Sequence, residues 1–121
     1  MRKVILVADD SSMIRKLVSR ALESQGFKVI TASDGMEALE KMALEEVDLV
    51  ITDLNMPNVD GYEFISSLRQ SEAYREVPVI ILSSEAKESD KERGFQVGAN
   101  AYLVKPFNPK RIQYEVAKFL N

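Results

Sequence analysis

Residues 48–61 read Asp-Leu-Val-Ile-Thr-Asp-Leu-Asn-Met-Pro-Asn-Val-Asp-Gly. After Asp48, the run at 48–52 is rich in apolar and β-branched residues, as a strand buried on both faces requires. Asp53 follows this run directly. Asp60, with Glu63 three residues later, has the spacing of a capping box at a helix start. The stretch therefore predicts a strand, a loop that begins with a carboxylate, and a helix.

The same unit recurs along the chain. Short β-branched runs alternate with stretches of helical period, and no repeat or low-complexity segment interrupts them. Five strands in alternation with five helices predict an α/β fold, an open, doubly wound parallel sheet with right-handed crossovers. We expect one domain over 1–121. The predicted strands are 3–8, 28–32, 48–52, 79–82 and 101–104.

Caps and apolar stripes locate the helices. Gly26 should end the first helix, Asp34 with Glu37 should begin the second, and Asn108-Pro109 should begin the last. The apolar stripe of the first helix is Ile14, Leu17, Val18, Ala21 and Leu22, and that of the last is Ile112, Val116, Phe119 and Leu120. Core-filling methionines are expected at 13, 36, 42 and 56.

The fourth helix, over 87–97, differs from the others. It is almost wholly polar and carries Gly94 in its interior. Glycine weakens a helix interior, so we expect this helix to be the least stable.

The composition narrows the chemistry. The chain has no cysteine and no histidine, which excludes thiol chemistry and removes the commonest general base and transition-metal ligand. Carboxylates, hydroxyls and lysine remain, and these suit hard cations. A net charge of −3 disfavours direct binding to nucleic acid. The apolar runs are too short to cross a membrane, and the N-terminus lacks a signal-peptide pattern, so we expect a cytoplasmic protein.

Chemistry-bearing residues follow four of the predicted strands. In open parallel sheets the functional crevice lies beyond the carboxyl ends of the strands. Three carboxylates brought together there raise one another's pKa unless positive charge neutralises them. Mg²⁺, or Mn²⁺ in its place, together with a lysine would neutralise them. Because such a cation also binds phosphate oxygens, a phosphoryl group is the expected ligand of this site. The residues are Asp9, Asp10, Asp53, Ser83, Ser84 and Lys105.

These residues, in this order, resemble the receiver domain of two-component response regulators, and in particular its single-domain chemotaxis type. The resemblance covers essentially the whole chain and implies the flavodoxin-like (βα)5 fold with strand order 2-1-3-4-5. It rests on Asp9-Asp10, the run at 53–61, Ser83 and Lys105-Pro106-Phe107.

The resemblance implies that Asp53 accepts a phosphoryl group from a sensor histidine kinase. Because this chain has no histidine, the donor is another molecule. Side chains of Asp10 and Asp53 and the backbone carbonyl of Asn55 would ligate Mg²⁺, and Asp9 would act directly or through water. Lys105 and Ser83 would hold the phosphoryl oxygens. Mg²⁺-dependent phosphorylation from small donors and autodephosphorylation are expected.

The resemblance also implies a route to the surface. Ser83 and Tyr102 would move toward the phosphoryl group and change the face formed by 87–97, 101–104 and the last helix. Asn55 and Glu85 match the positions that tune phosphoryl lifetime. Ser83 replaces the commoner threonine. Ser84 stands where alanine or glycine is commoner, so the size of the gap beside the phosphoryl group does not follow from the resemblance. Lys105-Pro106 is a candidate cis peptide.

Other interpretations stay open. Singly, each residue has a structural explanation; Asp9-Asp10 with the serines that follow could simply cap a helix. A flavin carrier fits the sheet, but acids occupy its phosphate-binding loop. In a haloacid dehalogenase-type phosphatase the nucleophile lies on the first strand, unlike Asp53. A pseudo-receiver that is never phosphorylated stays open, although the intact set of Asp9, Asp10, Asp53, Ser83 and Lys105 argues against it. A receiver domain excised from a larger regulator or hybrid kinase would look the same.

The expected partners are proteins. We expect a monomer that docks onto an output target, in chemotaxis or motility, with the histidine kinase as donor and a phosphatase as a further candidate. Neither direct nucleic-acid binding nor membrane insertion is expected. The identities of the kinase and target do not follow from the sequence.

Overall fold

The computed structural model describes residues 2–120, so the ends of the expected domain at 1 and 121 lie outside the described residues. Within residues 2–120, strands and helices alternate as predicted. The strands are β1 (Val4–Ala8), β2 (Lys28–Ala32), β3 (Leu49–Thr52), β4 (Val79–Ser83) and β5 (Ala101–Val104). The helices are α1 (Ser12–Glu23), α2 (Gly35–Leu44), α3 (Gly61–Gln70), α4 (Glu88–Val97) and α5 (Pro109–Leu120).

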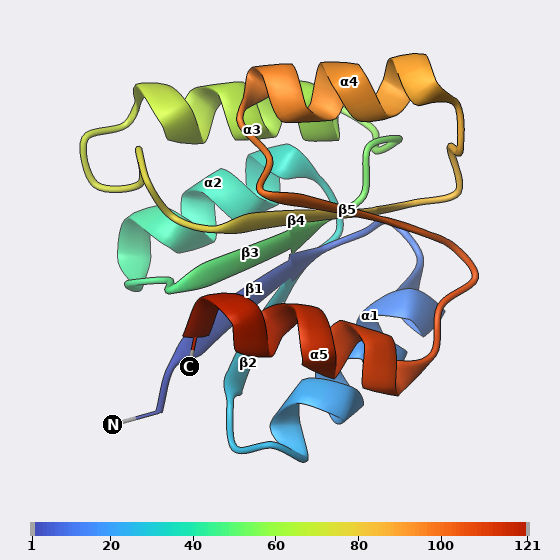
Figure 1. The fold of residues 1–121 in the computed structure, drawn as a ribbon. Helices are drawn as coiled ribbons and strands as arrows, with labels where there is room; N and C mark the ends of the chain where they lie inside the picture. The colour runs from blue at the N-terminus through green and yellow to red at the C-terminus, as the bar shows by residue number, and fades with distance from the viewer. Residues whose placement is uncertain (1, 121) are drawn as a thin grey trace.

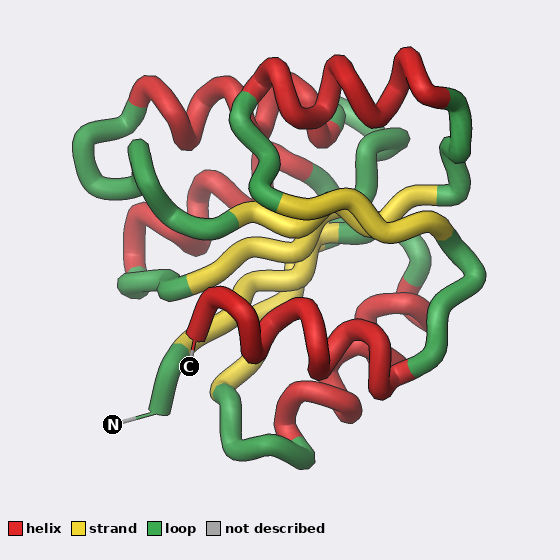
Figure 2. Tube along the Cα trace, viewed as in Figure 1, coloured by secondary structure: helices red, strands yellow, loops and turns green. Residues whose placement is uncertain are grey.

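The strands form one parallel sheet (Figures 1 and 2) in the order β2-β1-β3-β4-β5. This confirms the predicted fold and strand order. β3 is the central strand and β1 is its neighbour, so the loops that follow them emerge side by side at the carboxyl end of the sheet.

Helices cover both faces of the sheet: α2, α3 and α4 lie on one face and α1 and α5 on the other (Figure 1). Successive strand residues point to opposite faces. In β1, Leu6 and Ala8 join the core under α2 and α3, whereas Ile5 and Val7 join the core under α1 and α5. Both faces are buried, which explains why the strands read as continuous apolar runs.

Side-chain caps begin four of the helices. Asp34 Oδ1 accepts from the Glu37 N–H at 2.8 Å, and Asp60 Oδ1 accepts from the Glu63 N–H at 2.9 Å. The predicted caps of α2 and α3 are therefore confirmed, as is the cap of α5, where Asn108 Oδ1 accepts from the Arg111 N–H. Ser11 caps α1.

Some predicted core positions are wrong. Leu17 is 45% exposed because successive helical residues are about 100° apart, which turns it outward when Val18 faces the sheet. Met13 and Met36 are 68% and 50% exposed, whereas Met42 and Met56 are buried as predicted. Gly26 does not end α1 directly: the helix ends at Glu23, and Gly26, at φ 92°, lies in the turn before β2.

Within the described residues, the helices are either too short or too polar to span a membrane.

Candidate functional site

Four of the six side chains predicted to meet at the strand ends do meet: Asp9, Asp10, Asp53 and Lys105. Lys105, after β5, lies between two carboxylates that follow β1 and β3. Its Nζ is 2.9 Å from Asp9 Oδ2 and 3.3 Å from Asp53 Oδ2. Asp10 joins them, because each of the three acids offers an oxygen and these oxygens lie within 4.8 Å of one another. We call Asp9, Asp10 and Asp53 the acid cluster.

Burial makes the acid cluster electrostatically unusual. Asp9 and Asp53 are only 1% and 7% exposed, whereas Asp10 is exposed. Burial and the nearby Asp9 charge raise the pKa of Asp53 above its ordinary value, although Lys105 opposes the shift. Burial alone would lower the pKa of Lys105, but its hydrogen bond to Asp9 and the charges of both acids raise it. One ammonium thus faces three carboxylates, an all-oxygen donor set with excess negative charge that fits a hard divalent cation.

Hydrogen bonds occupy every polar group of Asp9. Its N–H donates to the Ala32 carbonyl at 3.0 Å, and Oδ1 accepts from the Ser11 N–H at 2.9 Å. Oδ2 bonds Lys105, and the carbonyl accepts from Arg15 Nη1 at 2.6 Å. Asp9 is therefore held rigidly. By contrast, the carboxylate of Asp10 makes no hydrogen bond to residues 2–120 and stays free to bind a ligand.

The loop that carries Asp53 is also fixed. The Asp53 N–H donates to the Ala8 carbonyl at 2.8 Å, and Oδ1 accepts from the Leu54 N–H at 2.8 Å. The Thr52 hydroxyl donates to the Asp53 carbonyl at 2.8 Å. A Cβ at Gly61 would collide with that same carbonyl, so only glycine allows α3 to begin this close to the loop. The sequence did not indicate the role of Thr52, and it showed Gly61 only as the end of the run at 53–61, because both residues act on backbone atoms.

The remaining predicted residues form a second group around Glu85. Its N–H donates to the Oγ of the buried Ser83 at 3.1 Å, and its carbonyl accepts from the Tyr102 hydroxyl at 2.7 Å. Asn55 Nδ2 donates to Glu85 Oε1 at 3.1 Å. Ser84 lies exposed next to Ser83. The loop after β4 thus connects Asn55, beside the acid cluster, to Tyr102 on β5.

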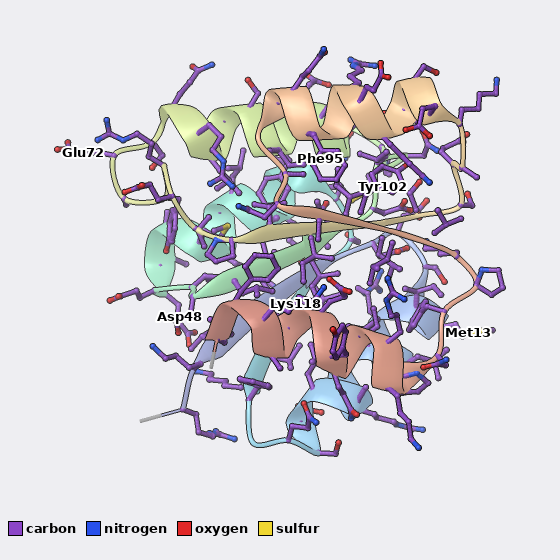
Figure 3. All side chains as sticks on the ribbon, in the orientation of Figure 1. Met13, Asp48, Glu72, Phe95, Tyr102 and Lys118 are labelled. Atoms are coloured by element: carbon purple, nitrogen blue, oxygen red, sulfur yellow. The ribbon has the colours of Figure 1, made fainter. Side chains whose placement is uncertain are left out.

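Tyr102 lies between the sheet and α4 (Figure 3). Its partial burial raises the pKa of the phenol above its ordinary value. The expected Lys105-Pro106 cis peptide is present. The expected output surface, α4, β5 and α5, therefore borders the site through Tyr102.

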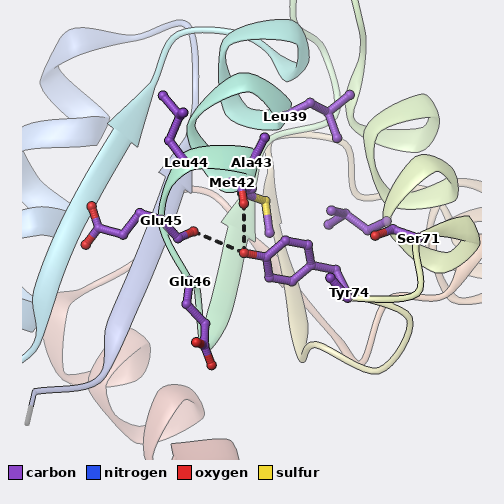
Figure 4. Close-up of a pocket in the computed structure, with 10 residues that line it drawn as sticks. Leu39, Met42, Ala43, Leu44, Glu45, Glu46, Ser71 and Tyr74 are labelled. Atoms are coloured by element: carbon purple, nitrogen blue, oxygen red, sulfur yellow. Dashed lines mark hydrogen bonds between the residues drawn. The ribbon is translucent and has the colours of Figure 1, made fainter.

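An apolar cavity of about 430 Å³ lies elsewhere, between the end of α2 and the segment after α3. Figure 4 shows the Tyr74 hydroxyl in hydrogen bonds to the carbonyls of Met42 and Glu45 at its wall. No member of the acid cluster lines it, so this cavity is not part of the candidate site.

The response regulator receiver domain model matches residues 5–117. The chain belongs to the response regulator receiver domain family. Such domains accept a phosphoryl group from histidine kinases and pass the signal to output partners.

Known proteins resemble this receiver domain over nearly its whole length. It is 41% identical over 120 residues to the alkaline phosphatase synthesis transcriptional regulatory protein PhoP of Bacillus subtilis, a match that covers 99% of this chain and 49% of that protein. The chain thus spans about half the length of this curated relative.

Solved structures of receiver-type proteins also superpose on this chain over nearly its whole length. The chemotaxis protein CheY4 of Vibrio cholerae superposes with a TM-score of 0.94 at 38% identity, covering 99% of this receiver domain and all of that chain. The receiver domain of a sensor histidine kinase from Pseudomonas aeruginosa, which has a magnesium ion in its active-site cleft, gives 0.90 at 29% identity, with 98% of each chain covered.

Proposed function

We propose that this receiver domain is a phosphoacceptor switch in which Asp53 takes a phosphoryl group from a partner histidine kinase. The observation that carries the proposal is the acid cluster itself, a buried, rigidly held carboxylate beside two further acids and bonded by one lysine. Burying such a group lowers the stability of the fold. A chemical role for Asp53 would explain why a destabilising acid is present there.

In the proposed transfer, an Asp53 carboxylate oxygen attacks the phosphorus of a phosphohistidine on the kinase. The new P–O bond forms as the P–N bond breaks, and the imidazole leaves with the electron pair of that bond. Transfers of this kind depend mainly on positioning and charge stabilisation. Lys105, already at Asp53 Oδ2, and Ser83 would hold phosphoryl oxygens.

We further propose Mg²⁺ as the cofactor, with Mn²⁺ as a substitute. The side chains of Asp10 and Asp53 and the backbone carbonyl of Asn55 would hold it. Because Asp9 already bonds Ser11 and Lys105 through its two carboxylate oxygens, it would contribute through a water. When bound, the cation neutralises charge on the transferring oxygens.

The signal would leave through Ser83 and Tyr102. Movement of Ser83 toward the phosphoryl group would disturb its bond with the Glu85 N–H and, through Glu85, the Tyr102 hydroxyl. This would change the α4-β5-α5 face that a protein target contacts. Asn55 and Glu85, linked at 3.1 Å, would tune how quickly water removes the phosphoryl group.

Two candidate functions differ in the output that this receiver domain controls. Similarity to CheY4 over that whole chain supports a chemotaxis or motility regulator, which we propose acts as a monomer. Similarity to PhoP over half of that protein supports the receiver part of a larger transcriptional regulator. A phosphatase is a further candidate partner in either case.

Intact mass tests the proposal. The protein and Asp53→Asn are incubated with a small phosphodonor, with Mg²⁺ or with chelator. We expect one phosphoryl adduct that requires both Asp53 and the cation. No adduct under any condition would contradict the proposal and favour a pseudo-receiver that binds partners without phosphorylation.

A further inference from the structure

We propose that Arg15 is a positioning residue that holds the backbone of the acidic pair, an inference that rests on the proposed cation site. Arg15 Nη1 donates to the Asp9 carbonyl oxygen at 2.6 Å. Side chains on a helix lean toward its N-terminus, so Arg15, in the first turn of α1, reaches back past the Ser11 cap to the end of β1.

Arg15 has no competing task in the described part of the chain. It makes no ion pair among residues 2–120, and its side chain makes no hydrogen bond there other than the one to Asp9. The side chain is also half-buried, which limits competition from water. A charged donor to a carbonyl is among the stronger protein hydrogen bonds.

The consequence concerns Asp10. Its carboxylate is exposed and has no partner within residues 2–120, so its direction depends on the backbone at either side. On one side, Arg15 and Ala32 hold the main chain of Asp9. On the other side, Ser11 is held by its bond to Asp9 Oδ1 and by capping α1. Without Arg15, Asp10 would sample more orientations, and the cation would bind less tightly.

Electrostatics alone predict the opposite sign. A guanidinium near a cation site repels the cation, so removing its charge should strengthen binding. Lys16 provides the matched control, because it is the next residue, carries the same charge and is exposed, and its side chain makes no hydrogen bond or ion pair in the described chain.

The experiment measures Mg²⁺ affinity by calorimetry for the parent protein, Arg15→Met, Arg15→Lys and Lys16→Met. We expect Arg15→Met to weaken affinity roughly tenfold, as loss of a residue that orients a ligand usually does. The Mg²⁺ affinity of Arg15→Lys should lie between those of Arg15→Met and the parent. The affinity of Lys16→Met should equal or slightly exceed that of the parent. In chelator, amide resonances of residues 9–11 should broaden in Arg15→Met only.

Unchanged or stronger binding in Arg15→Met would overturn the inference, as would an equal loss in Lys16→Met. Urea unfolding in chelator checks that each variant is folded. If Arg15→Met does not fold, Arg15→Lys decides: weaker affinity with its fold intact supports the role, and parental affinity overturns it. A parent that binds no Mg²⁺ would overturn the proposed cation site together with this inference, whereas a parent that binds Mg²⁺ without being phosphorylated would contradict only the phosphoacceptor role.

Discussion

At the scale of single residues, the surroundings of Asp53 favour its protonated, neutral carboxyl group over the charged carboxylate. Burial and Asp9 raise its pKa, and Lys105 only partly opposes them. A carboxyl group with a raised pKa binds its proton more tightly in the folded protein than in the unfolded chain. The stability that Asp53 contributes is therefore present below its pKa in the unfolded chain, and it is lost as the pH rises through its higher pKa in the folded protein.

Replacing Asp53 by asparagine should stabilise the protein at pH 7 in chelator. The amide keeps the shape but removes the buried charge. The gain in the free energy of unfolding should shrink as the pH falls below the ordinary carboxyl range, where the parent is protonated in both states. Urea unfolding at several pH values measures this.

Glu46→Gln is the control, because Glu46 is exposed and makes no ion pair within residues 2–120. It should change stability little at any pH. A parent that is more stable than Asp53→Asn at pH 7 would contradict the electrostatic description of the site.

The sequence located the side chains of the acid cluster well, because strand ends in a parallel sheet meet at one edge. Asp9, Asp10, Asp53 and Lys105 were found by that rule. Arg15 was not found, since it acts through a backbone carbonyl of Asp9, and no pattern of residue types records such a contact. The chemical roles of the acid cluster and of Lys105 remain predictions.

At the scale of elements, α4 differs from the other helices. Its N-cap, Lys87, makes no side-chain capping bond, and the only buried residue of α4 is Gly94. Contacts with α3 hold it in place: the Arg93 guanidinium lies 3.9 Å from the Tyr62 ring centroid, and the Tyr62 hydroxyl donates to the Asp90 carbonyl.

Gly94 has a packing role that the sequence did not indicate. A Cβ there would lie 2.7 Å from Ile81 Cδ1, so the glycine lets α4 approach the sheet closely. The sequence suggested only that it weakens the helix. Both effects follow from the missing side chain, and distinguishing them required knowing which face of α4 is buried.

We expect the amide hydrogens of α4 to exchange faster than those of α1 and α5. α4 buries little apolar surface, whereas α1 and α5 bury Val18, Leu22, Ile112 and Val116. Hydrogen exchange read by NMR measures this in the resting protein. Equal protection of the three helices would remove the case for α4 as the movable element.

The connection from α2 to β3 should depend on the Tyr74 hydroxyl. This hydroxyl accepts from the Val47 N–H at 3.3 Å and bonds the carbonyls of Met42 and Glu45 at 2.8 and 3.0 Å. Tyr74→Phe should lower the free energy of unfolding by about 1–3 kcal/mol, measured by urea unfolding.

The control is Tyr114→Phe, at an exposed tyrosine on α5. It should shift stability by less than about 0.5 kcal/mol. Similar small effects of both substitutions would show that water replaces the Tyr74 bonds at little cost.

At the scale of the whole molecule, the sheet could be predicted because several strands are near-continuous apolar runs and each crossover contains a helix. Strand bounds differ by at most one residue from the predicted ranges. Exposure was harder to predict: Met13, Leu17 and Met36 are apolar yet exposed. Apolar residues are common on protein surfaces, so residue type alone does not tell a core position from a surface one.

Mg²⁺ should stabilise the entire fold. A ligand that binds only the folded state adds about 2.7 kcal/mol at a hundredfold excess over its dissociation constant. The unfolding midpoint should therefore rise with Mg²⁺ and fall back with chelator. In Asp10→Asn the rise should be much smaller, and an equal rise would show that the cation binds elsewhere.

The most direct test of the central claim is to locate the phosphoryl group by its chemistry. After brief reaction with a small phosphodonor and Mg²⁺, the protein is treated with hydroxylamine, which cleaves acyl phosphates but leaves serine phosphates intact, and is then mapped by peptide mass. We predict loss of the phosphoryl group and a hydroxamate at Asp53. A phosphoryl group that resists hydroxylamine, or one that maps to Ser83 or Ser84, would contradict the assignment of Asp53 as the acceptor.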